Sequence, residues 1–535
     1  MSSALSPAAL AISDLTFIWP DGQPVFTGLD LTVGAGRTAL IGANGSGKST
    51  LLRLLTGELT PTGGTVRVDG ALAYLPQDLT LDAARPVDDV LGIAATRRAL
   101  AAIERGSADP VHYATVGDDW DVDERARSEL DRFGLGHLDL DRRVGTLSGG
   151  EAVLLGLAGQ LLRRPRVLLL DEPTNNLDRA ARERLYATVT AWPGVLLLVS
   201  HDRELLELVD QVAELRDGTA RLFGGTLSEY EAALAVEQEA AQRAVRVAEG
   251  DVRRQKRELA DAHVKLARRL RYGQKMWDTK REPKAIMAAR KREAQVSAGK
   301  HRGMHEERLA SARERLATAE EAVRDDAIIR IDLPATAVPP GRRVLTVRDA
   351  VLRNGVRLSL DVYGPERIAL LGANGSGKTT LLSTLVGTVP PRSGEVDIAV
   401  PVRLLPQRLD VLDDDLSIVA NVHRMAPAAG DNAIRARLAR FLFRGARAER
   451  PVGTLSGGER FRATLATLLL AEPAPQLLLL DEPTNNLDLA SARQLGEALA
   501  AYQGALVVAS HDLTFLRTLG ITRWLTLDRA PRSVP

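Results

Sequence analysis

The chain has 535 residues, no cysteine, and 70 Lys+Arg against 69 Asp+Glu, a formal net charge of +1. The length predicts two or three domains with their own cores, and the lack of cysteine excludes disulfides, iron–sulfur clusters and thiolate zinc sites. No apolar run approaches the roughly 18 residues that cross a bilayer, and the start lacks the basic and apolar regions of a secretory signal. We therefore expect no transmembrane segment and a cytoplasmic location.

The charge is unevenly distributed along the chain. From Asp251 to His305 there are 17 Lys+Arg and 6 Asp+Glu, a net charge of +11, so the remainder of the chain carries −10. Seven of the nine lysines lie between Lys256 and Lys300. A basic segment inside an otherwise acidic protein predicts a localised contact with a polyanion.

The first motif in chain order is a phosphate-binding loop. Residues 42–49 fit the pattern G-x-x-x-x-G-K-[ST] between an apolar stretch and a helical pattern, and residues 372–379 repeat them. The glycines let backbone N–H groups surround phosphates at a helix N-terminus, and the lysine neutralises their charge. The predicted ATP-binding residues are Gly42, Asn44, Gly45, Ser46, Gly47, Lys48, Ser49 and Thr50 in the first copy, and Gly372, Asn374, Gly375, Ser376, Gly377, Lys378, Thr379 and Thr380 in the second.

Two further motifs follow buried-strand patterns. Leu-rich runs end in Asp-Glu at 171–172 and 481–482, and another apolar run precedes a histidine in each half. Strand ends direct these side chains at the nucleotide, so the aspartates are predicted to hold Mg²⁺, the glutamates to polarise the attacking water and the histidines to bond the γ-phosphate. The predicted catalytic residues are Glu172, Glu482, His201 and His511; the predicted Mg²⁺ ligands are Ser49, Gln77, Asp171, Thr379, Gln407 and Asp481, of which both glutamines are also predicted to contact ATP.

All these motifs recur in the same order, which indicates one α/β domain present twice. The second copy is offset by 330 residues at the loop and the glutamine, by 308 at Leu-Ser-Gly-Gly-Glu and by 310 at Asp-Glu and the histidine. The first copy therefore carries 22 extra residues before its Leu-Ser-Gly-Gly-Glu. We interpret the stretch around 101–120 as an enlarged helical subdomain or a surface insertion.

Both halves resemble ATP-binding cassette (ABC) nucleotide-binding domains, because residues 147–151 and 455–459 match the Leu-Ser-Gly-Gly-Glu signature. The resemblance implies a head-to-tail sandwich in which each ATP contacts the loop of one half and the signature of the other, so that ATP joins the halves and hydrolysis releases them. Trp19 lies where such domains often place an aromatic ring against adenine, whereas the aligned residues 352–355 have none. Ser456 and Gly458 would complete site one, and Ser148 and Gly150 would complete site two.

Within that family the chain is similar to the ABC-F subfamily. Both halves continue as Thr-Asn-Asn-Leu-Asp, in which Asn176 and Asn486 replace the usual histidine. The resemblance implies two tandem cassettes at 1–227 and 331–535, joined by a charged helical hairpin at 228–330, in a monomer with an intramolecular sandwich. It also implies an ATPase that uses ATP and Mg²⁺ and acts on the ribosome, where the linker enters from the E site and touches P-site tRNA and ribosomal RNA.

The linker has a seven-residue apolar repeat at 245–266 and again at 309–323, which predicts an antiparallel helical hairpin. The turn is predicted within 271–283, where Gly273 and Pro283 interrupt helix. Basic and aromatic side chains together favour RNA contact, while the alternative is a solvated coiled coil whose aromatics pack on its own loop. The predicted RNA-contacting residues are Arg271, Tyr272, Lys275, Trp277, Lys280, Arg281 and Lys284.

Two roles are open within this interpretation, a general translation factor and antibiotic resistance by ribosome protection. The alternative from another class is the energy subunit of a membrane exporter, in which a basic arm of this length has no role. Zinc-dependent repair ATPases and recycling factors with iron–sulfur domains do not fit a chain without cysteine.

The two sites are predicted to hydrolyse ATP at unequal rates. Residues 152–154 after the first signature are Ala-Val-Leu, whereas residues 460–462 after the second are Arg-Phe-Arg. Single-turnover hydrolysis by Glu172→Gln and Glu482→Gln proteins measures each intact site in turn. Equal residual rates would contradict the prediction.

Overall fold

The computed structural model describes residues 10–77, 82–175, 177–278, 303–320, 333–407, 410–485 and 487–527. It divides into two compact units, one made of residues 1–227 and 327–535 and the other of residues 228–326. Within the described part of the chain, we find no helix with the length and apolar character needed to cross a membrane.

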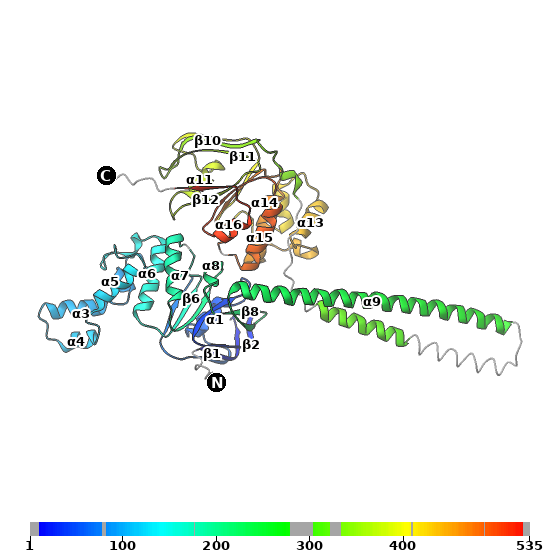
Figure 1. Cartoon of the computed structure of the whole chain (residues 1–535), viewed down its shortest axis with the longest axis horizontal. Coiled ribbons are helices and arrows are strands. Elements are labelled where there is room, and N and C mark those ends of the chain that lie inside the picture. Colours follow the sequence, from blue (N-terminus) through cyan, green and yellow to red (C-terminus); the bar gives the residue numbers. More distant parts are fainter. Residues whose placement is uncertain are drawn as a thin grey trace. The chain divides into compact units, whose positions relative to one another are not determined.

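The first half of the larger unit contains a small antiparallel sheet and a mainly parallel sheet (Figure 1). The strands that precede Asp171 and His201 are buried at every position, as expected for parallel strands covered on both faces, which explains their unbroken apolar sequence. The antiparallel sheet has the order β2 (Pro24–Val33), β1 (Leu10–Ile18) and β4 (Gly63–Val68). The second sheet has the order β5 (Leu72–Leu75), β6 (Val167–Asp171), β7 (Val195–Val199), β3 (Gly36–Ile41), β8 (Gln211–Arg216) and β9 (Thr219–Gly224), with β9 antiparallel to β8.

The extra residues of the first half form helices. Residues 101–120, where the comparison of the two halves placed the extra residues, contain the end of one helix and another short helix. Within this stretch the rings of Tyr113 and Trp120 lie with their centroids 6.2 Å apart. The interpretation as a helical enlargement agrees with this. The helices of this half are α1 (Lys48–Leu55), α2 (Val87–Val90), α3 (Ala94–Glu104), α4 (Pro110–Val116), α5 (Val122–Arg132), α6 (Gly149–Leu162), α7 (Arg179–Thr190) and α8 (Arg203–Leu206).

The second half repeats both sheets, and within the described residues its parallel sheet has one strand fewer. Its antiparallel sheet has the order β11 (Arg357–Tyr363), β10 (Arg343–Val351) and β13 (Ser393–Ile398). Its parallel sheet has the order β14 (Val402–Leu405), β15 (Leu477–Asp481), β16 (Ala505–Ala509), β12 (Arg367–Leu371) and β17 (Arg523–Thr526). Its helices are α11 (Lys378–Leu385), α12 (Ile418–Met425), α13 (Asp431–Arg440), α14 (Gly457–Leu469), α15 (Leu489–Ala501) and α16 (Leu513–Thr518).

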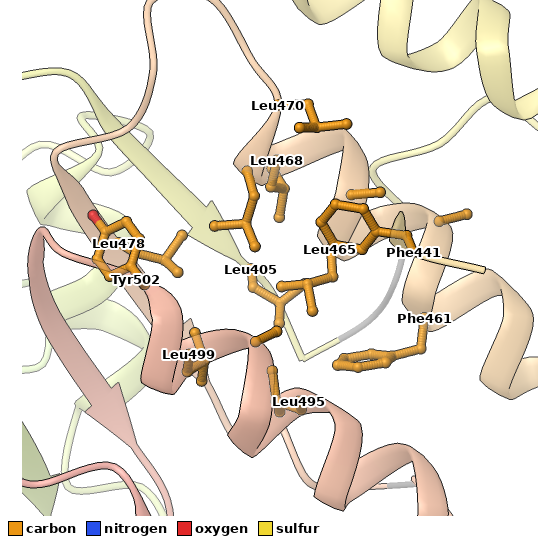
Figure 2. Packing of buried hydrophobic residues seen from close by; sticks show 14 of the residues in the cluster. Leu405, Phe441, Phe461, Leu465, Leu468, Leu470, Leu478, Leu495, Leu499 and Tyr502 are labelled. Atoms are coloured by element: carbon orange, nitrogen blue, oxygen red, sulfur yellow. The ribbon is translucent and has the colours of Figure 1, made fainter. Parts of the chain in front are cut away.

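A large apolar cluster joins the helices of the second half to its parallel sheet, and Figure 2 shows its centre. Phe441 and Phe461 point into it from separate helical segments, and Tyr502 fills the end beyond α15. The buried Tyr502 hydroxyl donates to the carbonyl of Pro475 at 3.2 Å, which satisfies its polar group. This packing fixes α14, the helix that carries the second signature, against strand β15 and its Asp-Glu.

The smaller unit is a helical arm. Helix α9 (Leu227–Asp278) has 52 residues, which corresponds to about 78 Å, and residues 303–320 form a helix that returns beside it (Figure 1). Val252 packs against Leu309 and Ala312, with Leu259 and Leu316 around them, and these are positions of the predicted heptads. Asp251 also pairs with Arg315 across the two helices at 3.2 Å.

The predicted interruption at Gly273 was wrong, because α9 runs through this glycine to Asp278. A single glycine inside a helix costs only about 1 kcal/mol relative to alanine, and the strong helix formers around it outweigh that cost. The predicted turn is therefore absent from 271–278. The side chains of Tyr272 and Trp277, together with residues Lys280, Arg281, Pro283 and Lys284, lie outside the described residues, as do Asn176 and Asn486.

Candidate active site

Two candidate ATP sites lie at the carboxyl ends of parallel strands. In the first half, β7 lies between β6 and β3, so the residues after these three strands meet at one sheet edge. These are His201, Asp171 with Glu172, and the phosphate-binding loop. The second half repeats the arrangement with β16 between β15 and β12. Open α/β sheets bind ligands at this edge.

Each phosphate-binding loop ends at a glycine that no other residue replaces easily. Gly47 precedes α1 with φ +99°, and a Cβ there would lie 2.6 Å from Val25 and 2.7 Å from Phe26. Gly377 has φ +107° and is covered by the side chain of Asn354. Both constraints exclude a side chain where the backbone must approach phosphate closely.

The loop lysines are buried and bonded to their own loops. Lys48 Nζ donates to the carbonyls of Gly42 at 2.8 Å and Ala43 at 3.0 Å. Lys378 Nζ donates to the Gly372 carbonyl at 2.8 Å and lies 2.8 Å from His511 Nε2. Burial lowers the pKa of both lysines, against the attraction of neighbouring carboxylates. A polyanionic ligand would compensate this burial of positive charge.

The glutamate and histidine of each site form a close pair. His201 Nε2 lies 3.0 Å from Glu172 Oε1, and His511 Nε2 lies 3.5 Å from Glu482 Oε1. Glu172 and Glu482 have φ values of +47° and +44°, a left-handed conformation that is uncommon outside glycine and clusters at functional sites. Because an ammonium group only donates, Nε2 of His511 accepts from Lys378.

Burial sets the protonation of these pairs. It raises the pKa of Glu172 to about 8, against the nearby Lys48, and that of Glu482 to about 7, against Lys378. Burial and the adjacent lysine lower the pKa of His201 to about 3 and that of His511 to about 4. The histidines are therefore neutral near pH 7, while both carboxyl groups titrate in the range that suits proton exchange with water.

The oxygen groups at each site fit a magnesium ion. Thr379 forms a side-chain hydrogen bond with Asp481, whose Oδ1 is buried and has no hydrogen-bond partner within the described structure. Gln407 lines the same cavity, of about 310 Å³, together with Thr379 and Asp481. Hydroxyl, carboxylate and amide oxygens are the ligand types that Mg²⁺ prefers. At the first site Asp171 is buried at the end of β6, and Ser49 and Gln77 follow β3 and β5.

The signature motifs begin helices α6 and α14. Ser148 and Ser456 are exposed helix caps, each in a reciprocal pair of hydrogen bonds with the glutamate three residues later. Gly150 and Gly458 are buried one residue into the helix. The second signature lies beside the first loop, because a Cβ placed on Gly457 would lie 3.9 Å from Asn44 Nδ2. The contacts of the four predicted signature residues with ATP remain predictions.

The structure adds contacts that motif reading missed. Asn44 N donates to Asp488 Oδ2 at 2.9 Å, so the first loop contacts the other half at the last residue of Thr-Asn-Asn-Leu-Asp. Leu177 and Arg182 of the first half line the second cavity. Asp488 and Leu177 lie within the repeated Thr-Asn-Asn-Leu-Asp segment and Arg182 lies four residues after it, so the repetition of this segment was the signal that the sequence offered.

The aromatic difference between the sites also has a structural basis. Trp19 is half-buried, with its ring centroid 5.0 Å from that of Phe17, in the β1–β2 hairpin. The corresponding connection of the second half, residues 352–356, has the same length and the same backbone hydrogen bonds, with Leu352 in the place of Trp19. Asn354 in this connection donates to the carbonyl of Ser376 at 3.2 Å and lines the cavity. A role of Trp19 in stacking adenine stays a prediction.

Comparison with known proteins agrees with this geometry. The family model "ABC transporter" matches residues 26–175 and 356–485, one match in each half. The tylosin resistance ATP-binding protein TlrC of Streptomyces fradiae is 36% identical over 521 residues, with 92% of each chain covered. The chain belongs to the ATP-binding cassette family and, within it, to the ABC-F subfamily. It is an ABC-type ATPase with two tandem cassettes.

Other similarities extend along most of this ABC-F chain. ABC transporter F family member 2 of Arabidopsis thaliana is 28% identical, with 90% of this chain and 71% of the relative covered. The solved structure of "RNase-L Inhibitor" covers 96% of this chain and 87% of its own with a TM-score of 0.57 at 18% identity, a likeness that shows the shared fold.

The buried glutamate of the first cassette predicts a pH-dependent stability effect. The Glu172 pKa is raised above its unfolded value of 4.5, so the folded state holds the extra proton and stability falls as pH rises from about 4.5 to 8. Glu172→Gln removes this dependence. The variant should melt a few degrees above the wild type at pH 8.5 and close to it at pH 5. Nucleotide-free thermal melts at both pH values measure this, and a difference independent of pH would contradict it.

Proposed function

We propose that the protein acts on the ribosome, where ATP-driven closure of its cassettes engages the basic arm with RNA and confers resistance to tylosin or a similar ribosome-directed antibiotic. The observation that carries this proposal is the match to TlrC, a tylosin resistance protein by name, along 92% of both chains. Only 8% of the chain lies outside the match, which is less than the length of the arm, so the similarity is one of the whole protein rather than of a cassette.

The charge of the arm supports an RNA partner. Along the later half of α9 the exposed basic residues are Arg253, Arg254, Lys256, Arg257, Lys265, Arg268, Arg271 and Lys275. The apolar side chains described above face the returning helix, which leaves these cations on the outer surface of the hairpin. Phosphate neutralisation by Lys and Arg dominates binding to nucleic acid. Within this proposal Arg271 and Lys275 contact RNA near the tip.

In this proposal the two ATP sites control the closure of the cassettes. Residues Ser49, Gln77 and Asp171 would hold Mg²⁺ at site one, and Thr379, Gln407 and Asp481 at site two, where the ion would neutralise phosphate charge. Glu172 and Glu482 would accept the proton of the attacking water, and His201 and His511 would bond the γ-phosphate. The bond between Asn44 and Asp488 joins the two cassettes beside site one, so a ligand at this loop bears on cassette closure.

The tip prediction is tested by charge reversal within the described part of α9. Arg268→Glu, Arg271→Glu and Lys275→Glu together should weaken ribosome binding and lower its salt slope by about 2–3, since each lost phosphate contact removes roughly 0.7–0.9. Intrinsic ATPase activity should be nearly unchanged. Arg243→Glu with Arg246→Glu, exposed on the earlier part of the same helix, is the matched control. Undiminished binding by the triple variant would argue against an RNA-contacting tip.

The resistance role is tested in a tylosin-sensitive bacterial host. Expression of the wild-type chain should raise the minimal inhibitory concentration of tylosin several-fold, and the triple arm variant should lose the increase. Susceptibility to a drug that acts away from the ribosome should not change. Ribosome binding without any change in tylosin susceptibility would favour a general translation factor instead.

A further inference from the structure

The second ATP cavity contains a cation supplied by the first cassette. The cavity is lined by the second loop and its Lys378, by Glu482 and His511, and by Leu177 and Arg182 of the first cassette. Arg182 lies one turn into α7, just after the Thr-Asn-Asn-Leu-Asp segment. None of the ATP-site motifs read from the sequence includes it.

An ion pair and a hydrogen bond to the backbone hold the Arg182 side chain in place. Its Nη1 lies 3.0 Å from Asp202 Oδ2, its Nε donates to the Leu177 carbonyl at 3.3 Å, and its side chain is 15% exposed. The Tyr186 hydroxyl donates to the same Asp202 oxygen at 2.7 Å, and Asp202 Oδ1 accepts from Leu205 N. A guanidinium has five N–H donors in a planar fork, so these two bonds orient it and leave donors for an anion.

The charge of Arg182 acts on the groups of the second site. After burial and Lys378, Arg182 contributes to lowering the pKa of His511, and it opposes the burial that raises the pKa of Glu482. These effects place a positive charge close to the two groups that face the reacting phosphate in the proposed reaction. Arginine matches phosphate geometry with two parallel hydrogen bonds.

At the position of the second cassette that corresponds to Arg182, the residue is alanine. The repeat offset of 310 aligns Arg182 with Ala492 on α15, which packs at the edge of the apolar core of the second cassette. A methyl group carries no charge and no donor. The two sites therefore differ at the position that each receives from the other cassette.

From this arrangement we propose that Arg182 is a phosphate-binding residue supplied in trans, which contacts the triphosphate at the second site, whereas the aligned position that would serve the first site is Ala492. The proposal rests on the ATPase activity of the cassettes and does not depend on the ribosomal role. It predicts that the second site binds ATP more tightly than the first when the two cassettes are closed.

The test compares the two sites in the full chain. Arg182→Gln is combined with Glu172→Gln, so that only the second site hydrolyses, and separately with Glu482→Gln, so that only the first does. Loss of a charge-assisted contact to phosphate should raise the half-saturating ATP concentration or slow single-turnover hydrolysis at the second site by about 10- to 100-fold. The loss at the first site should be at least about tenfold smaller.

The matched control is Arg179→Gln, because Arg179 lies on the same helix, is 69% exposed and pairs at the surface with Glu183 at 3.0 Å. It should leave both sites within about twofold of their parents, as expected for an exposed pair. Equal losses at the two sites in the Arg182 variant would show a structural role and overturn the proposal. Unchanged hydrolysis at the second site would also overturn it.

Arg182→Lys guards against a folding defect of the glutamine variant. It keeps a cation beside Asp202 but lacks the planar fork. If Arg182→Gln melts early, a loss confined to the second site in the lysine variant supports the proposal. Equal losses at both sites, or no loss at the second, would contradict it.

Discussion

A buried lysine next to buried carboxyl groups is the interaction on which the rest of this structure depends. Lys378 lies 3.7 Å from Glu482 Oε1. Burial lowers the pKa of the lysine and raises that of the glutamate, so it favours the neutral form of each group. Burying charge is costly unless the groups are paired, so the cassette needs a rigid frame to hold them together. Fully buried parallel strands provide that frame and end at one edge of the sheet.

The same constraint explains the backbone at each site. Glutamates with positive φ follow β6 and β15 directly, and their backbone N–H groups bond to the ends of the neighbouring strands at 2.8 Å. A strained residue persists only where its surroundings determine it. The backbone of Glu172 is thereby fixed beside His201, and that of Glu482 beside His511.

Much of this site could be predicted from the sequence because its signals are local. The loop at 42–49, the Asp-Glu after a leucine run and the histidine after the next run each combine a motif with a strand pattern, and their repetition strengthens both. The heptads of the arm likewise predicted the packing of Val252 against Leu309. The continuation of α9 through Gly273 was missed, since helix propensity summed over neighbours outweighs one residue.

What could not be predicted depends on residues far apart in the chain. Nothing local to Arg182 indicates that it lines a cavity built by residues near 378 and 481, and nothing local to Asn354 indicates that it covers Gly377. Both are set by tertiary packing. The two sites therefore share the loop, Asp-Glu and histidine but differ at positions that packing between distant residues brings to them.

The central claim is that ATP binding by the paired cassettes drives engagement of a basic arm with the ribosome. It is tested most directly by sedimenting 70S ribosomes with the Glu172→Gln, Glu482→Gln protein in the presence and absence of ATP. We expect the protein to pellet with ribosomes only when ATP is present. Absence from the pellet while ATP binding is confirmed, or pelleting that is indifferent to ATP, would contradict the account.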